Sequence, residues 1–549
     1  MKLHLRRRDR KLSKFQVVSS LSIFVFIISS SFGLTAFSSN QTTSILPASS
    51  QASFNNYLHV QLLGVNDLHG QLDKYQSVSG VKTGGAEFLA AYLKKYKQEN
   101  PNTILVHAGD MVGGSPPISS QFHDEPTIEF LNQLHFDVGT PGNHELDHGV
   151  NEMKHLIYGG FNENTGYFPG STASYISANI IDKNTGTSLL PPYVIKQIDG
   201  VKIGFIGAVT TETNLYVLPE NRKEIEVTDE VSAINRTVKL LKEKGIKAIV
   251  VLAHVSAKSD QQGTNPTDAL TQMAPKIDKE VDVIFAGHSH DYANTVVDGK
   301  LIVQAYSYGK AFSQVNITID RKTKDIVRKE AKIILTAHNQ IQPDQETIEL
   351  LKKYQNKLGS NFNTIVGAIS EDISRIPDAK GESPLAKMIA ESERKAMGTE
   401  IAFVHQGEMR ESLKKGNVSL ENLYTALPFG HHVNKVTLTG AQIKLALEQQ
   451  WRIGQENDML QAVGITYSYD LNAPMGKRIV ELKDMNRQDL QPTKEYEVAI
   501  SDYLANGGDE FTAFKQGRLI EPGPLVVDVL SNYIKQNYPN VVIPQSQGR

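Results

Sequence analysis

Residues 103–110 read Thr-Ile-Leu-Val-His-Ala-Gly-Asp, a short apolar run that ends in a glycine and a carboxylate. A continuous apolar run of this length is typical of a strand that is covered on both faces of its sheet. The glycine allows a close approach of the backbone, and the aspartate follows directly at the end of the strand. The same pattern returns along the chain, and it predicts both the fold and the place of a site.

Seven such runs are predicted to be strands. They are Leu58–Val65, Thr103–Ala108, Phe136–Thr140, Lys202–Ala208, Ala248–Ala253, Val281–Ala286 and Leu301–Tyr306. Amphipathic stretches between them, such as Glu87–Gln98, Thr127–Leu134 and Val231–Glu243, are predicted to be helices. Buried strands that alternate with helices indicate an α/β fold, in which sites collect where strands end.

Five polar clusters follow predicted strand ends. They are Asp67-Leu68-His69, Gly109-Asp110, Gly142-Asn143-His144-Glu145, His254 and Gly287-His288-Ser289-His290. A single D-x-H or H-x-H is weak, because it is more often a capped loop or a surface pair. Five clusters in one α/β segment supply the carboxylate, amide and imidazole ligands of two adjacent divalent metal ions. They predict a dinuclear site suited to hydrolysing phosphate esters.

Length and composition limit the alternatives. A chain of 549 residues is too long for one ordinary core, so we expect two folded domains. Cysteine is absent, which excludes disulfides, thiolate metal sites and cysteine nucleophiles. The formal net charge of −3 gives no reason to expect a nucleic-acid partner by bulk electrostatics, so we expect a small-molecule substrate. Oligomeric state is not predicted.

The N-terminus is predicted to direct export. A basic stretch at residues 6–14 precedes an uncharged apolar stretch at roughly 15–37, the arrangement of a signal peptide. The apolar stretch is also long enough to span a bilayer, so a retained N-terminal membrane anchor is the alternative. Residues 1–37 are therefore assigned to the signal or anchor, and the Ser/Thr/Asn-rich residues 38–56 to a flexible spacer. Either reading places the working domains outside the cytoplasm, secreted or at the cell surface.

The five clusters, in this order, resemble the signature of the calcineurin-like metallophosphoesterases: D-x-H, G-D, G-N-H-E/D, H and G-H-x-H. The resemblance implies a four-layer α/β/β/α sandwich over residues 57–337. It implies that the first metal is held by Asp67, His69, Asp110 and His290, and the second by Asp110, Asn143, His254 and His288. His144 would face the phosphate or the leaving group, and Asp147 would orient it.

The mechanism expected from this resemblance follows from charge. Two divalent ions, whether Mn, Zn or Fe, lower the pKa of a water held between them, and the resulting hydroxide attacks phosphorus in line. The six histidines at 59, 107, 123, 135, 148 and 155 lie near the motifs but are expected to be structural.

The C-terminal part resembles the two-domain 5′-nucleotidases. The resemblance rests on Leu427-Pro428-Phe429-Gly430, on Val436-Thr437-Leu438-Thr439-Gly440-Ala441 and on Tyr503-Leu504-Ala505-Asn506-Gly507-Gly508-Asp509. It implies a smaller α/β substrate-binding domain at 361–549. Between the two domains, a charged helical segment around 342–357, followed by a break at Gly359-Ser360, is predicted to be an interdomain helix and hinge at 338–360. Phe429 and Tyr503 would stack on a nucleotide base, which tolerates different bases, and Asp509 would bind ribose hydroxyls.

This part of the chain departs from the family in two segments. Arg410 is kept to grip the substrate. His405 is also expected to bind it, but it stands where the family has Asn, and Glu408 adds a negative charge beside an anion site. The segment 382–387 reads Glu-Ser-Pro-Leu-Ala-Lys and lacks the family's Gly and Asn. These departures leave the preferred substrate open.

The function predicted is that of an exported dinuclear-metal phosphohydrolase, a 5′-nucleotidase. Two alternatives use the same scaffold: a 2′,3′-cyclic nucleotide phosphodiesterase and a nucleotide-sugar hydrolase. An alternative of another class is a surface binding protein with a vestigial site. The complete set of ligands disfavours it, because a site freed from catalysis should have lost some of them.

Overall fold

A computed structural model of the chain describes residues 56–378, 381–451 and 459–539. The predicted signal or anchor at 1–37 lies outside the described residues, as does the spacer at 38–56 except for its last residue. Within the described ranges, no helix combines the length and apolar character needed to cross a membrane. All described residues belong to one compact unit.

Two six-stranded sheets form the N-terminal half. The first has the order β18 (Asp325–Leu335), β17 (Ala311–Asp320), β1 (Tyr57–Val65), β4 (Thr103–Ala108), β5 (Val138–Thr140) and β8 (Ser174–Tyr175). The second has the order β10 (Tyr193–Ile198), β11 (Val201–Val209), β13 (Ala248–His254), β14 (Val281–Phe285), β16 (Lys300–Ala305) and β15 (Tyr292–Val297). The central strands of each sheet run parallel, and antiparallel strands close the edges at β18, β10 and β15.

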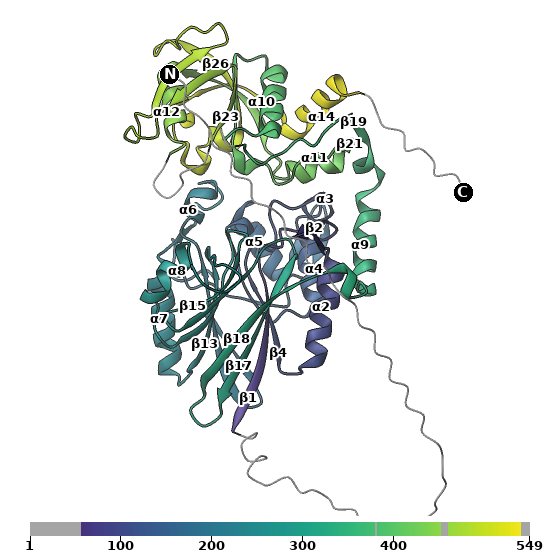
Figure 1. Cartoon of the computed structure of the whole chain (residues 1–549), viewed down its shortest axis with the longest axis vertical. Helices are drawn as coiled ribbons and strands as arrows, with labels where there is room; N and C mark the ends of the chain where they lie inside the picture. Colours follow the sequence, from purple (N-terminus) through teal and green to yellow (C-terminus); the bar gives the residue numbers. More distant parts are fainter. Residues whose placement is uncertain (1–55, 379–380, 452–458, 540–549) are drawn as a thin grey trace, which may run out of the picture. The chain divides into compact units, whose positions relative to one another are not determined.

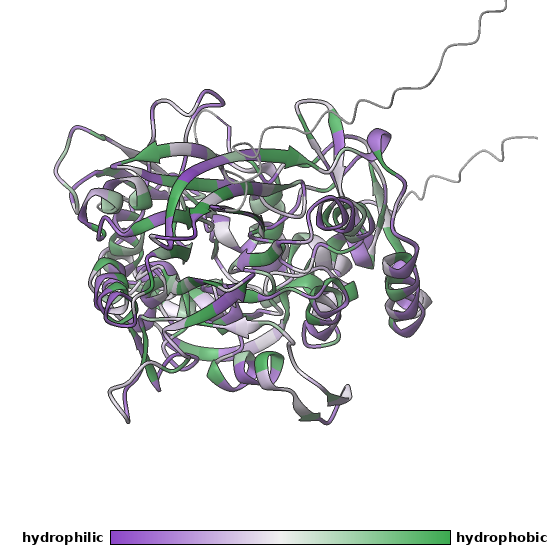
Figure 2. Ribbon diagram, turned by 90° about the horizontal axis from the view of Figure 1, so that it is seen from below, coloured by the Kyte–Doolittle hydropathy of each residue, from purple (hydrophilic) through white to green (hydrophobic). Residues whose placement is uncertain are grey.

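The two sheets pack face to face over an apolar core that includes Leu62, Val106, Phe205 and Val250. Helices α2 (Ala86–Glu99) and α4 (Glu125–Leu134) share the core on the outer side of the first sheet, and α7 (Glu230–Glu243) and α8 (Ala269–Met273) that of the second (Figure 1). The outer helices carry both hydrophobic and hydrophilic residues, as amphipathic helices do (Figure 2). The predicted α/β/β/α sandwich is confirmed.

Shorter elements complete this half. They are β2 (Tyr75–Val78), β3 (Val81–Gly84), α3 (Pro117–Ser120), α5 (Val150–Tyr158), β6 (Gly160–Asn162), β7 (Gly166–Phe168), β9 (Ile180–Asp182), α6 (Thr213–Tyr216) and β12 (Ile225–Val227). All seven predicted strands and the three predicted helices are present, with ends that differ from the predicted ones by two residues or fewer. Each central strand delivers its last residues to the same edge of its sheet.

Helix α9 (Gln345–Leu358) follows, close to the charged helix predicted there. The Asp344 carboxylate caps its N-terminus by accepting from the Thr347 N–H at 3.0 Å, and Gly359 ends it with a φ of 76°. Its role as a hinge stays a prediction, as do the predicted domain boundaries.

A five-stranded mixed sheet forms the C-terminal half. Its order is β23 (Gln461–Val463), β20 (Ile401–Val404), β26 (Glu495–Ser501), β22 (His432–Thr439) and β27 (Arg518–Leu525). Helices α10 (Pro384–Met397), α11 (Leu420–Ala426) and α14 (Val526–Asn537) share one apolar core with it, and α12 (Gly440–Glu448) a second. Two antiparallel two-stranded sheets flank it, one of β19 (Ile365–Ile369) with β21 (Gly416–Ser419) and one of β24 (Ile465–Tyr469) with β25 (Ile479–Asp484), and α13 (Asp502–Ala505) follows β26. The predicted smaller α/β half is confirmed.

Candidate metal centre and adjoining cavity

Five of the seven predicted metal ligands have a left-handed backbone. The φ angles are 50° at Asp67, His69 and Asp110, 80° at His288 and 60° at His290. This conformation costs an L-residue roughly 1–2 kcal/mol, so a group of them marks a place where the fold holds local strain. Such strain concentrates at functional sites. Here the left-handed backbone turns each ligand-bearing loop away from the end of its strand and towards the edge of the sheets where the ligands meet.

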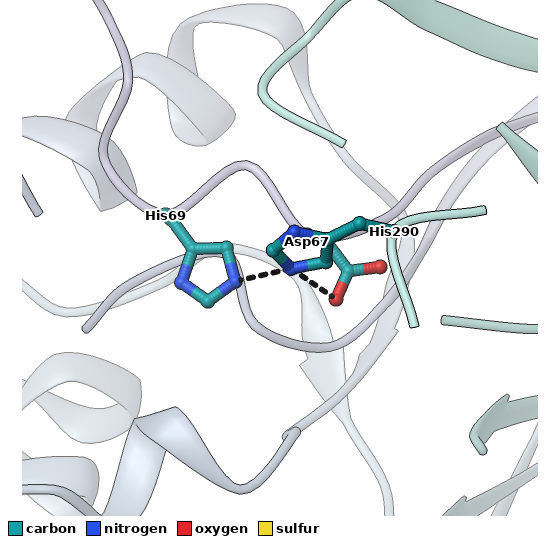
Figure 3. Close-up of side chains that lie close together, drawn as sticks. All are labelled: Asp67, His69 and His290. Carbon is teal, nitrogen blue, oxygen red and sulfur yellow. Dashed lines mark hydrogen bonds and ion pairs between the residues drawn. The ribbon is translucent and has the colours of Figure 1, made fainter. Parts of the chain in front are cut away.

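The first group of candidate ligands is Asp67, His69 and His290 (Figure 3). The Nε2 atoms of His69 and His290 lie 3.0 Å apart, and His290 Nε2 lies 3.5 Å from Asp67 Oδ1. Two imidazole nitrogens and a carboxylate oxygen therefore converge from loops that are far apart in sequence. A cation satisfies such a convergence of lone pairs.

The second group centres on Asp110. Its Oδ2 lies 3.0 Å from His254 Nε2 and 3.6 Å from His69 Nε2, and His288 joins Asp110 and His254 within ligand distance of one ion. Asp110 thus has candidate partners in both ligand sets and can bridge two cations. Asn143 Oδ1 is buried nearby and has no hydrogen-bond partner among the described residues. An unpartnered buried carbonyl oxygen is costly, and a metal ion would relieve that cost.

Neighbouring acceptors select which ring nitrogen each histidine offers. His69 Nδ1 donates to the Gly113 carbonyl at 2.7 Å, and His254 Nδ1 donates to the Ala108 carbonyl at 2.8 Å. In the neutral rings the lone pair is therefore on Nε2, which faces the centre. His288 is held the other way round, because its Nε2 lies 2.8 Å from Glu212 Oε2 and leaves Nδ1 for a metal. The sequence analysis missed Glu212, which has no motif around it.

Burial and charge act against each other at the centre. Burial raises the pKa of Asp67 to about 6, against the opposing charge of His254. Burial would also raise the pKa of Asp110, but His254 and His144 outweigh it and hold that pKa well below its usual range. Burial lowers the pKa of His254, whereas Asp110 raises it, and the balance brings it to about 10. Asp110 is therefore the ionised carboxylate at the heart of the site.

His144 and Asp147 form the predicted pair. Nδ1 of His144 lies 2.7 Å from Asp147 Oδ2, and the His144 backbone N–H donates to Asp110 Oδ1 at 2.9 Å. Burial lowers the pKa of His144, but the Asp147 and Asp110 carboxylates outweigh it, so the pKa is raised. The second ring nitrogen, Nε2, remains for contact with a ligand in the cavity.

Glu145 is a functional candidate to which the sequence analysis gave no role. Its buried carboxylate accepts from the backbone N–H groups of Asp110 at 3.0 Å, Met111 at 2.9 Å and Gly142 at 2.5 Å. Burial, followed by the charge of Asp110, raises the pKa of Glu145 to about 7. The loops it joins pack so closely that a Cβ on Gly142 would collide with the Asp110 carboxylate. Its presence in the G-N-H-E run was the available signal.

A cavity of about 850 Å³ opens from the metal centre. Its lining includes Asp110, Asn143 and His144 on one side and all five predicted substrate residues on the other, which are His405, Arg410, Phe429, Tyr503 and Asp509. Arg410 Nη2 lies 3.4 Å from both ring nitrogens of His69, and its guanidinium carbon lies 5.6 Å from the centre of the Phe429 ring. Four of the seven predicted metal ligands and all five predicted substrate residues therefore line one space.

The altered C-terminal segment forms a network of paired charges. His405 Nδ1 lies 2.8 Å from Asp509 Oδ2, and His431 Nδ1 lies 3.1 Å from Asp502 Oδ1. Glu408 is buried and accepts from the Ser501 hydroxyl at 3.1 Å. Burial, against the opposing charges of His431 and His405, raises the pKa of Glu408. The negative charge expected at Glu408 is thereby weakened.

Comparison with known proteins gives two family matches and several relatives. Residues 60–292 match the family described as calcineurin-like phosphoesterase, and residues 365–516 match the 5′-nucleotidase C-terminal domain. The chain is 38% identical over 465 residues to Endonuclease YhcR of Bacillus subtilis, an alignment that covers 83% of this chain but only 38% of that protein. It is 34% identical over 543 residues to Cell wall protein Lmo0130 of Listeria monocytogenes, covering 89% of this chain and 69% of that protein.

One solved structure is similar over nearly the whole length. The 5′-nucleotidase precursor from Thermus thermophilus superimposes with a TM-score of 0.75 at 23% identity, covering 90% of this chain and 99% of that one. At this identity the likeness supports the two-part fold described above.

Proposed function

Because the chain belongs to the 5′-nucleotidase family of metal-dependent phosphoesterases, we propose that it releases phosphate from nucleotides as a 5′-nucleotidase. The observation that carries this proposal is one continuous cavity. It joins the ligand groups around Asp110 to the aromatic rings of Phe429 and Tyr503. A phosphate at the first end places its nucleoside against the second.

The proposed metal ligands fall into two sets that share Asp110. The first is Asp67, His69, Asp110 and His290, and the second is Asp110, Asn143, His254 and His288. The buried His/Asp clusters fit the dinuclear centre that is typical of this family. When bound, two such cations, Mn, Zn or Fe, activate water for attack on phosphorus and neutralise phosphoryl charge.

The chain's own groups then act on the substrate. Arg410 lies against His69 and binds a phosphoryl oxygen as a charge-assisted donor. His144 holds its proton on Nε2, because Asp147 accepts from Nδ1 and raises the pKa, and it donates to the leaving ester oxygen. Asp509 is tied to His405 through Oδ2 and offers Oδ1 to a ribose hydroxyl.

An endonuclease activity is the second candidate, because of the relative named Endonuclease YhcR. This chain spans 38% of that protein's length, and a polynucleotide needs a track of cations for its phosphates. In the described lining of the cavity, His144, His405 and His431 each have a carboxylate partner. This pairing favours a small nucleotide, so we propose a nucleotide substrate and treat a nucleic acid as an outcome of the test.

We also propose that the protein acts outside the cell, secreted or at the surface, and a relative named a cell wall protein supports this. Fractionation of cells that express the full chain tests it. The expressed protein should be found outside the cell membrane or attached to its outer face, whereas an exclusively cytoplasmic protein would contradict the proposal.

The test of function is phosphate release by the purified full chain with Mn²⁺ or Zn²⁺. The substrates are AMP, ADP, ATP, UDP-glucose, 2′,3′-cyclic AMP and single-stranded DNA, and Asp110→Asn is the inactive control. Faster hydrolysis of AMP than of the others, lost in the variant, is the expected result. Faster cleavage of the cyclic nucleotide, the nucleotide sugar or the DNA moves the function to that class. Inactivity on every substrate favours a binding protein with a vestigial site.

A further inference from the structure

A third ring lies against both aromatic residues that are proposed to hold the nucleobase. The His431 ring centre is 5.6 Å from that of Phe429, with the planes 26° apart. It is 5.3 Å from the ring centre of Tyr503, with the planes 34° apart. Both separations fall within the range of favourable aromatic pairs. One imidazole therefore already makes the contacts that a base stacked on the two rings would make.

His431 is fixed in this place from two directions. Its Nδ1 lies 3.1 Å from Asp502 Oδ1, and its backbone carbonyl accepts from the Val526 N–H at 2.9 Å at the start of α14. The carbonyl contact fixes the backbone from which the ring extends, and the ring itself loses its contact with Asp502 if it swings aside. A nucleobase that enters the cavity therefore meets a ring that resists displacement.

The surroundings of the two aromatic residues leave little other ring surface. Gly508 packs so closely on Tyr503 that a Cβ there would collide with the ring. The Tyr503 hydroxyl donates to the Tyr216 carbonyl at 3.1 Å, which further limits how the ring can turn. Phe429 stacks on His144 with ring centres 5.9 Å apart and planes 20° apart.

We propose that His431 is the specificity-determining residue of the nucleoside end of the cavity, because it occupies the stacking place between Phe429 and Tyr503 and so denies a base the two-sided sandwich. The inference rests on the proposed function and deepens it. The site then takes a substrate whose phosphoryl group is held by Arg410 and whose nucleoside is held by Asp509 and by one ring face, and it discriminates weakly among bases. Removing the imidazole should open the second face and tighten the binding of an adenine nucleoside.

The test uses adenosine, which carries no phosphate and is not turned over. Its dissociation constant is measured by calorimetry on metal-loaded full chain, for wild type, His431→Ala, Tyr503→Ala and the double variant. The neighbouring His432→Ala, exposed and outside the cavity lining, is the matched control. Asp502→Asn, which replaces the charged partner with a weaker neutral acceptor and so loosens the imidazole without removing it, is a second variant should His431→Ala fold poorly.

We expect His431→Ala to bind adenosine about tenfold more tightly, towards the lower end of the range for one base–aromatic stack. Tyr503→Ala should change the constant by less than about twofold in wild type but abolish the gain in the His431→Ala background. Asp502→Asn should shift the constant in the same direction by a smaller factor, and His432→Ala should not shift it.

Equal or weaker binding by His431→Ala overturns the inference, because the imidazole would then read the base or play no part. Absence of measurable adenosine binding in both wild type and His431→Ala overturns it as well. The proposed function is judged separately, by AMP hydrolysis in wild type. A gain in adenosine affinity supports the inference even if AMP proves not to be the substrate.

Discussion

The Glu145 carboxylate accepts from the backbone N–H of Asp110 at 3.0 Å, and it thereby fixes the backbone from which the central carboxylate of the site extends. The same Glu145 oxygen accepts from Gly142, one residue before Asn143. Two loops that carry candidate ligands are thus clamped by one side chain that is not itself a ligand. Loss of an outer contact of this kind typically lowers metal affinity by roughly 10–100-fold.

Glu145→Gln replaces one carboxylate oxygen with an NH₂ group, which cannot accept from a backbone N–H. We expect metal affinity to fall roughly 10–100-fold, and unfolding free energy to fall by about 1–3 kcal/mol, because buried N–H groups lose their acceptor. Titration with Mn²⁺ and thermal unfolding measure the two effects. Glu163→Gln, on an exposed turn, is the control. Unchanged metal affinity in Glu145→Gln would refute the clamp.

Asp147→Asn should change the pH dependence of turnover. Burial lowers the pKa of His144, and the Asp147 charge is the first of the carboxylate effects that raise it above its usual value. If protonated His144 donates to the leaving oxygen, activity is lost as pH rises through this pKa. Loss of the Asp147 charge lowers the pKa, so the alkaline limb of the pH–kcat profile moves to lower pH. At the optimum kcat falls by up to about 10²-fold.

The profile is measured on AMP, with Asp147→Glu as the conservative variant that should restore part of the shift. An alkaline limb that stays in place in Asp147→Asn would show that the pair does not act through this proton.

Glu393, which has no proposed role in catalysis, is expected to make the folding stability depend on pH. It lies fully buried on α10, and neither carboxylate oxygen has a hydrogen-bond partner among the described residues. Burial, followed by the charge of Glu408, raises its pKa well above the usual value. Its folded pKa exceeds its unfolded pKa, so the stability that this group contributes is present at low pH and is lost as pH rises through the folded pKa. Between the two pKa values the loss is about 1.4 kcal/mol per pH unit.

Glu393→Gln removes this titration. The free energy of unfolding of the variant should therefore increase relative to that of wild type as pH rises, with no such increase below about pH 4. Trp451, the single tryptophan of the chain, is buried in the C-terminal half, and its fluorescence reports the unfolding of that half. Glu391→Gln is the control, since Glu391 pairs with Arg394 at 2.8 Å and its pKa is lowered. A stability difference independent of pH would contradict the prediction.

Removal of metal should destabilise the N-terminal half. The cluster holds the carboxylates of Asp67 and Asp110 close enough that each raises the other's cost of ionisation, and divalent cations offset this repulsion. A ligand present at 1,000 times its dissociation constant stabilises the folded state by about 4 kcal/mol. Thermal unfolding with and without a chelator measures this effect. Asp110→Asn should show a much smaller difference, and an equal difference in both proteins would place the metal elsewhere.

The sequence was sufficient for the parts of the fold that depend on local pattern. Buried parallel strands such as β4 and β13 are continuous apolar runs, and their ends located the candidate ligands. The edge strands β10, β15 and β18 were not predicted, because half-exposed antiparallel strands have mixed polarity that resembles loop sequence.

Contacts between distant residues were beyond the sequence. Glu212 reaches His288 across 76 positions, and Glu145 reaches Asp110 across 35, so neither partner is visible in a motif. Likewise, His431 follows Phe429 by two residues and meets Tyr503 only when β22 and β26 pair. The family resemblance identified Phe429 and Tyr503 as the residues that stack on a base. It did not identify His431, because the contact of its ring with both residues forms only in the folded chain.

The most direct test of the account is metal content measured together with AMP turnover. Metal-free full chain is titrated with Mn²⁺ or Zn²⁺, and bound metal is counted by mass spectrometry while phosphate release is followed. We predict that turnover rises as two equivalents of metal bind. In Asp110→Asn, turnover should be lost, and at least one equivalent less of metal should bind. Full turnover by metal-free protein, or by Asp110→Asn, would contradict it.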